Sequence, residues 1–231
     1  MLFRKKPKLL PRDEFIERIL CTVPGMTPAA NLYLLDKAVA GMPDNSGVLE
    51  IGSFAGQSSI IIHYLMQKHK KKGKIVCVDP FIFAGWNDAT KNMDADYMRS
   101  VGNNTGMTRE NYLQFVENSF RQNVSFFCRE NIPALYKMKS DDFFHELKQG
   151  KFPELKDFHP GFCHIDGDHG KQATLNDVRN CVTISAEKAF FLIDDSYRKI
   201  SLGSGEAVKE IREWKELETV AENPNFLFRK M

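Results

Sequence analysis

The sequence has no long apolar run. Neither the charged N-terminal stretch MLFRKKPKLLPR nor any later segment provides the roughly 20 consecutive apolar residues that a membrane-spanning helix needs. The N-terminal stretch also lacks the apolar centre of a signal peptide. Internal repeats and low-complexity linkers are absent as well. We therefore expect a soluble cytoplasmic protein without a membrane partner, folded as one domain over residues 1–231.

The sequence also has little excess charge and few cysteines. Its 32 basic and 30 acidic residues leave a net charge of +2, which does not indicate a nucleic acid partner. The most basic stretch, KHKKKGK at residues 68–74, is typical of a helix C-terminus, although a nucleic-acid-binding patch is the alternative. The five cysteines are odd in number, lack C-x-x-C spacing and mostly lie in apolar runs. This pattern favours buried thiols over disulfides or a zinc site.

Short apolar runs alternate with segments of helical length along the chain. Runs rich in Val, Ile and Phe predict strands buried on both faces at residues 47–52, 74–79, 124–128, 161–166 and 189–194. Helices are predicted at residues 13–20, 28–40, 57–70, 109–122, 132–149, 172–185 and from about 206. Near the C-terminus, LETVA and FLFRKM flank the turn-rich ENPN and predict a hairpin. The alternation predicts an α/β fold with a doubly wound, mostly parallel sheet.

Four of the five predicted strands reach an acidic residue at their carboxyl ends. These residues are Glu50, Asp79, Asp166 and the pair Asp194 and Asp195. Ligands of such sheets bind beyond the carboxyl ends of the strands, so we expect one site to collect these side chains. One aspartate alone could be only a helix cap, and the prediction therefore depends on the set.

The loop LEIGSFAGQSS follows the first predicted strand. Gly52 and Gly56 permit a tight turn, and the helix after them offers free N–H groups to an anionic ligand. The spacing E-x-G-x-x-x-G differs from the dinucleotide fingerprint G-x-G-x-x-G, which argues against an oxidoreductase. Asp79, which ends the next strand, could accept hydrogen bonds from both hydroxyls of a ribose. Together these features predict a nucleoside ligand without a pyrophosphate, and a tight turn without any ligand is the alternative.

The stretches VLEIGSFAG and IVCVDPF resemble the first two motifs of class I S-adenosylmethionine-dependent methyltransferases. The resemblance covers residues 47–231 and implies a Rossmann-like sheet of seven strands with an antiparallel C-terminal strand. It implies that the glycine loop lines the methionine part of S-adenosylmethionine, that Asp79 binds the ribose, and that Asn131 contacts the adenine. The cofactor-binding residues that it implies are Glu50, Gly52, Ser53, Gly56, Asp79, Asn131 and Asp166.

The stretch IDGDHGK, followed later by FLIDDSY, is similar to metal-dependent small-molecule O-methyltransferases and their sugar-modifying relatives. This resemblance implies that Asp166, Asp194 and Asp195 hold Mg²⁺ or another divalent cation, and carboxylates are the ligands that such a cation prefers. His169 is the predicted general base, at a position where related enzymes often carry a lysine, and Asp168 is the rival base. The alternative is that these aspartates only cap a helix and a loop.

The resemblance implies methyl transfer to a hydroxyl of a small molecule, such as a sugar, a catechol-like ring or a natural product. Residues 82–122 are more than a crossover helix needs, and we interpret them as a cap or lid over the site, with residues 1–46 as N-terminal helices. His164 lies within a predicted strand and is interpreted as a core histidine. A catalytically silent binding subunit and a metal-independent methyltransferase are the alternatives, and the sequence leaves a homo-oligomer open.

Overall fold

A computed structural model describes residues 6–82, 108–197 and 203–231 of the chain. Its centre is a seven-stranded sheet with the order β3-β2-β1-β4-β5-β7-β6. The strands are β1 (Gly47–Ile51), β2 (Ile75–Val78), β3 (Ala134–Tyr136), β4 (Pro160–Ile165), β5 (Phe190–Ile193), β6 (Leu217–Glu222) and β7 (Phe226–Lys230). Strands β1 to β5 are parallel, and β7 is antiparallel to both β5 and β6. The predicted doubly wound, mostly parallel sheet with antiparallel C-terminal strands is confirmed.

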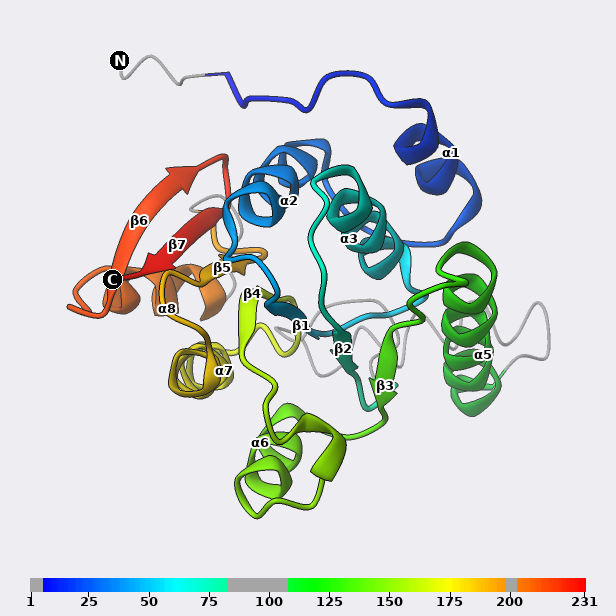
Figure 1. Cartoon of the computed structure of the whole chain (residues 1–231). Coiled ribbons are helices and arrows are strands. Elements are labelled where there is room, and N and C mark those ends of the chain that lie inside the picture. Colours follow the sequence, from blue (N-terminus) through cyan, green and yellow to red (C-terminus); the bar gives the residue numbers. More distant parts are fainter. Residues whose placement is uncertain (1–5, 83–107, 198–202) are drawn as a thin grey trace.

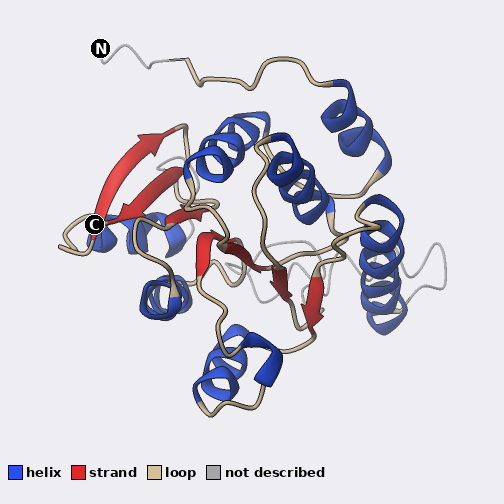
Figure 2. Cartoon of the chain, viewed as in Figure 1, coloured by secondary structure: helices blue, strands red, loops and turns tan. Residues whose placement is uncertain are grey.

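Helices cover both faces of this sheet (Figures 1 and 2). Their bounds are α1 (Glu14–Thr22), α2 (Ala29–Gly41), α3 (Gln57–Lys68), α5 (Arg109–Phe127), α6 (Ser140–Lys148), α7 (Lys171–Ile184) and α8 (Gly203–Ile211), with a 3₁₀ turn at Pro153–Leu155. Helices α1, α2, α3 and α5 lie on one face, and α6, α7 and α8 lie on the other. Among the described helices, none combines the length and the apolar character that crossing a membrane requires.

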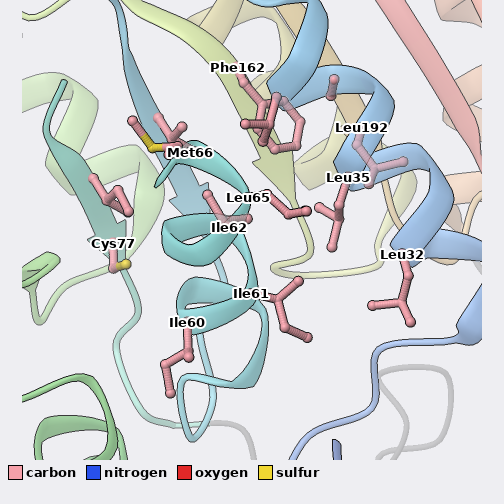
Figure 3. Close-up of a cluster of buried hydrophobic side chains, with 14 of the residues drawn as sticks. Leu32, Leu35, Ile60, Ile61, Ile62, Leu65, Met66, Cys77, Phe162 and Leu192 are labelled. Atoms are coloured by element: carbon pink, nitrogen blue, oxygen red, sulfur yellow. The ribbon is translucent and has the colours of Figure 1, made fainter. Parts of the chain in front are cut away.

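The strands contribute alternate residues to two apolar cores, one on each face. Val48 of β1 packs in the core under α2 and α3, whereas its neighbour Leu49 packs in the core under α6, α7 and α8. Figure 3 shows part of the first core, where Ile61 and Leu65 of α3 lie near Leu35 of α2. All five cysteines are free, and all but Cys21 are buried, as predicted.

The predictions for the third strand and the helix after it are wrong. Residues 124–128 are not a strand, because α5 runs through Phe127 and ends there. Val116, Phe120 and Val124 are buried at the spacing of one helix face, so the apolar run after Val124 continues a helix. The true third strand, β3, is a short edge strand inside residues 132–149, which we predicted as one helix. The other predicted helices and the C-terminal hairpin are confirmed.

Most of the predicted cap at residues 82–122 lies outside the described residues, since residues 83–107 do. The part from Arg109 onward belongs to α5, which packs against α3 as an ordinary helix of this face. Its first turn is fixed by a capping box, in which the Thr108 hydroxyl accepts from the backbone N–H of Asn111 at 3.1 Å. The cap over the site therefore stays a prediction for residues 83–107.

Candidate functional site

The sheet brings the predicted acidic residues together at the carboxyl ends of its parallel strands. Strands β2, β1, β4 and β5 are consecutive neighbours, and Asp79, Asp166 and Asp194 follow β2, β4 and β5 directly. The backbone N–H of Asp166 donates to the carbonyl of Ile51 at 2.8 Å, and that of Asp194 donates to the carbonyl of Ile165 at 2.9 Å. These bonds extend the strand ladders by one residue and hold Asp166 and Asp194 on adjacent strand ends.

The glycine loop after β1 packs directly on the end of β4. Gly52 has a φ of 81°, and a Cβ atom there would lie 1.9 Å from the carbonyl oxygen of Asp166. Only glycine combines this left-handed conformation with so close an approach. Gly56, with a φ of 89°, is the N-cap residue of helix α3. Between them, Ser53 is 2% exposed and its Oγ has no hydrogen-bond partner in the described part of the chain. The loop therefore presents a buried polar atom beside a helix N-terminus.

Asp79 ties this loop to the end of β2. Its Oδ2 accepts from the backbone N–H groups of Ser53 at 2.8 Å and Phe54 at 2.9 Å, and its Oδ1 accepts from Phe81 N–H at 2.7 Å. Burial raises the pKa of Asp79, although the three backbone donors oppose that rise. A carboxylate offers about four acceptor positions, so one position on Oδ1 is left for a further donor.

A buried ion pair lies beneath the loop. Glu50 of β1 and His164 of β4 are direct neighbours in register, and the His164 Nδ1 lies 3.0 Å from the Glu50 Oε1. Burial alone would lower the pKa of His164, but the Glu50 carboxylate outweighs it and raises that pKa to about 9. Burial would raise the pKa of Glu50, but His164 and a short hydrogen bond from the Ser59 hydroxyl lower it. Both groups are therefore charged in the core.

His164 also belongs to the acidic cluster, which sequence reasoning missed. One ligand atom each from His164, Asp166 and Asp194 lies within 4.8 Å of the others. Since Nδ1 of His164 faces Glu50, its Nε2 is the nitrogen available to this cluster. Partial burial and the Asp194 carboxylate raise the pKa of Asp166 to about 7. The two-residue spacing from His164 to Asp166 places both on one side of β4, and this period could have indicated the histidine.

The structure separates the two predicted bases. His169 lies between two carboxylates, with Nε2 at 3.3 Å from the Asp166 Oδ1 and Nδ1 at 3.7 Å from the Asp195 Oδ2. Asp195 has a φ of 47°, an uncommon backbone conformation for a residue with a side chain. Asp168 is exposed, and its Oδ1 accepts from the Gly170 N–H at 2.7 Å in the turn before α7. His169 thus contacts the cluster, whereas Asp168 supports the turn.

Asn131 does not join the site. Its side-chain amide donates to the carbonyl of Gly73 at 2.9 Å, and Gly73 lies just before β2, at the amino end of that strand. The prediction placed Asn131 after the third strand, but α5 occupies the predicted strand and Asn131 precedes β3. Asn131 therefore lies at the amino ends of the strands, whereas the acidic cluster lies at their carboxyl ends. This position corrects the prediction that Asn131 contacts the adenine.

Comparison with protein-family models matches residues 49–196 to a methyltransferase domain family. The match covers more than half of the chain and includes the glycine loop, Asp79, the acidic cluster and His169. The chain belongs to this methyltransferase domain family. No curated protein sequence matches this methyltransferase.

Solved structures share its fold at low sequence identity. Cofactor-bound Rv0187 from MTB is 13% identical with a TM-score of 0.59, over 96% of this chain and 92% of that chain. The O-methyltransferase from Bacillus cereus in complex with S-adenosylhomocysteine is 16% identical with a TM-score of 0.52, over 96% and 93%. The O-methyltransferase TomG from Streptomyces achromogenes, involved in tomaymycin synthesis and bound to S-adenosylmethionine, is 12% identical with a TM-score of 0.55, over 96% and 92%. These likenesses establish a methyltransferase fold.

Proposed function

We propose that this methyltransferase transfers the methyl group of S-adenosylmethionine to a hydroxyl oxygen of a small molecule, with a divalent cation such as Mg²⁺ at the acidic cluster. The observation that carries the proposal is the position of His164, Asp166 and Asp194 beside the glycine loop of a methyltransferase domain. Two of the proteins with this fold are O-methyltransferases that bind S-adenosylmethionine or its product, which supports the same chemistry here.

The glycine loop fits the cofactor in three respects. The N-terminus of α3 has free backbone N–H groups for a carboxylate, and Gly52 and Gly56 keep side chains away from that approach. The buried Ser53 Oγ has no partner in the described residues and could bond a polar group of the ligand. Asp79 keeps one acceptor position for a ribose hydroxyl. Glu50 supports the loop from beneath through His164 and Ser59.

The acidic cluster fits a hard divalent cation. The pKa of Asp166 rises partly because the Asp194 carboxylate is close, and a bound cation would relieve that repulsion. We assign Asp166 and Asp194 as ligands. The third ligand is His164, which shares their cluster, or Asp195, which the sequence resemblance implies. Because the pKa of His164 is about 9, a cation bound to its Nε2 would displace a proton, and cation affinity would rise with pH.

We assign His169 as the general base that accepts the proton of an acceptor hydroxyl. When bound, the cofactor supplies an electrophilic methyl group and the cation lowers the pKa of the acceptor hydroxyl. Without a cation, Nε2 of His169 lies 3.3 Å from the Asp166 Oδ1 and donates a hydrogen bond to it. A cation on Asp166 would take over that carboxylate, and a proton on Nδ1, 3.7 Å from the Asp195 Oδ2, would then leave Nε2 as the acceptor. Asp195 thus orients the imidazole, and Asp168 fixes the turn that carries it.

A metal-independent methyltransferase is the second candidate, favoured by one observation. His164 is held in its charged form by Glu50 and supplies a positive charge to Asp166 and Asp194 without any cation. The two candidates differ in whether a chelator stops the reaction.

The test is methyl transfer to a panel of catechols, sugars and phenolic natural products. The formation of S-adenosylhomocysteine is measured with Mg²⁺ and with a chelator, for the wild type, Asp166→Asn and His169→Gln. Activity that needs Mg²⁺ and is lost in both variants supports the proposal. Equal activity in chelator supports the metal-independent candidate. A wild type that fails to bind S-adenosylhomocysteine contradicts both.

A further inference from the structure

One oxygen of Asp194 is held by three N–H donors from three separate elements. The Asn31 amide on α2 donates to Asp194 Oδ1 at 2.6 Å, and the Asn225 amide in the β6–β7 turn donates to the same oxygen through a very short bond. The backbone N–H of Asp195 is the third donor, at 2.8 Å. Asn31, Asn225 and Asp194 are all buried, so water does not compete for these bonds.

The hydrogen-bond network fixes the orientation of both amides. The Asn225 Oδ1 accepts from the backbone N–H of Ser196 at 3.0 Å, so its Nδ2 must face Asn31 and Asp194. That Nδ2 also donates to the Asn31 Oδ1 at 3.0 Å, which leaves the Asn31 Nδ2 for Asp194. Flipping either amide would place two acceptors against each other, so both asparagines act as donors toward the carboxylate.

We propose that Asn31 and Asn225 are positioning residues that hold Asp194 Oδ1 and thereby present Oδ2 to the cation. The proposal rests on the metal site of the proposed function. With three donors on Oδ1, the acceptor positions of that oxygen are filled, and Oδ2 is the atom left for a ligand role. The donors keep the carboxylate in one orientation whether or not a cation is bound, as the partners of metal ligands commonly do.

Both residues lie outside the part of the chain that matches the family model. The family match covers residues 49–196, whereas Asn31 precedes it and Asn225 follows it. Helix α2 and the C-terminal hairpin therefore contribute to the cation site although neither carries a ligand.

Asn223 provides a matched control in the same turn. It is also buried, and its side chain bonds through both amide atoms: Oδ1 accepts from the Lys8 N–H at 2.6 Å, and Nδ2 donates to the carbonyls of Lys8 at 2.7 Å and Ala30 at 3.1 Å. These partners are all distinct from Asp194. Asn223→Ala therefore removes a buried, well-bonded amide without removing a donor to the cluster.

The test compares Mn²⁺ affinity, measured by electron paramagnetic resonance of the free ion, with thermal stability. We expect Asn225→Ala and Asn31→Ser to weaken Mn²⁺ binding by about tenfold or more, the usual effect of removing a partner of a metal ligand. Asn223→Ala should lower the melting temperature comparably but leave Mn²⁺ affinity within about twofold of wild type. Asn31→Ser keeps a hydroxyl for the Asn225 amide, and it serves as the second variant if Asn225→Ala does not fold.

Three results would overturn the proposal. If Asn225→Ala and Asn31→Ser bind Mn²⁺ as the wild type does, the metal site stands and the positioning role is wrong. If Asn223→Ala weakens Mn²⁺ binding as much as Asn225→Ala, the effect is general destabilisation. If the wild type itself binds no Mn²⁺, the metal site and the positioning role both fall, and binding of S-adenosylhomocysteine still tests the rest of the proposed function.

Discussion

Replacing Asp177 with asparagine should make the protein less sensitive to pH. Asp177 of α7 is 2% exposed, and its Oδ1 has no hydrogen-bond partner in the described residues. Burial raises the pKa of Asp177 to about 7; the Ser140 hydroxyl opposes the rise, and the carboxylates of Asp141 and Asp168 add to it. The folded protein therefore keeps this group protonated at a pH where the unfolded chain, near the ordinary value of 3.8, has lost the proton.

The sign and size of the effect follow from proton linkage. Between pH 5 and pH 7 the folded state binds about one more proton at Asp177 than the unfolded state, so stability falls by about 1.36 kcal/mol per pH unit. Above the folded pKa of about 7 both states are ionised and the loss stops. Asp177→Asn removes this loss, so its free energy of unfolding relative to wild type should rise by about 2.5 kcal/mol from pH 5 to pH 8.

Urea unfolding of wild type and Asp177→Asn at pH 5, 6, 7 and 8 measures this change. The constant cost of the new amide cancels because only the change with pH is compared, and other titrating groups cancel because both proteins contain them. Asp157→Asn is the control, since Asp157 is exposed to water in the folded and unfolded states alike. A difference between wild type and Asp177→Asn that is constant over this pH range would show that Asp177 does not keep its proton in the folded protein.

Three further substitutions test other parts of the structure. Glu50→Gln should cost about 3–5 kcal/mol of unfolding free energy, because it removes the carboxylate that stabilises the buried His164 cation, and burial should then lower the pKa of His164. In the wild type, the contribution of His164 to the free energy of unfolding should be complete below pH 6.5 and lost as the pH rises through about 9. A pKa of His164 that stays near 9 in Glu50→Gln, measured by NMR, would contradict the pairing. Gly52→Ala should lower the melting temperature sharply, because its Cβ atom would lie 1.9 Å from the Asp166 carbonyl oxygen; an unchanged melt would contradict this packing. Asn131→Ala should leave affinity for S-adenosylhomocysteine within about twofold of wild type in calorimetry, and a tenfold loss would restore the adenine contact.

The sequence correctly predicted the strands that a short stretch of residues specifies on its own. The runs around β1, β2, β4 and β5 are apolar and bounded by turn residues, and each reaches an acidic residue at the same edge. The stretch VSFFC has the same composition as a strand, but Val124 extends the buried stripe of α5, a tertiary contact that composition does not reveal. Misplacing this strand also misplaced Asn131, because its role depended only on its position relative to the strand end.

The contacts that complete the site join residues far apart in the chain. His164 looked like a core histidine, and it does occupy the core, but its charge depends on Glu50, which is 114 residues away. Asn31 and Asn225 lie in a helix and a turn without any motif, and only the folded sheet brings them to Asp194. Strand-end aspartates could therefore be predicted from the sequence, whereas the side chains that set their charge and orientation could not.

We expect the glycine loop and Asp79 to bind S-adenosylmethionine. Calorimetric titration of S-adenosylhomocysteine into the wild type, Asp79→Asn and the exposed control Asp157→Asn tests this expectation most directly. We predict binding to the wild type and to Asp157→Asn, with affinity about tenfold or more weaker in Asp79→Asn, because a hydrogen bond to a charged group contributes about 1.5–3 kcal/mol. A wild type that does not bind the ligand would contradict the cofactor site, and Asp79→Asn that binds it equally well would contradict the role of Asp79.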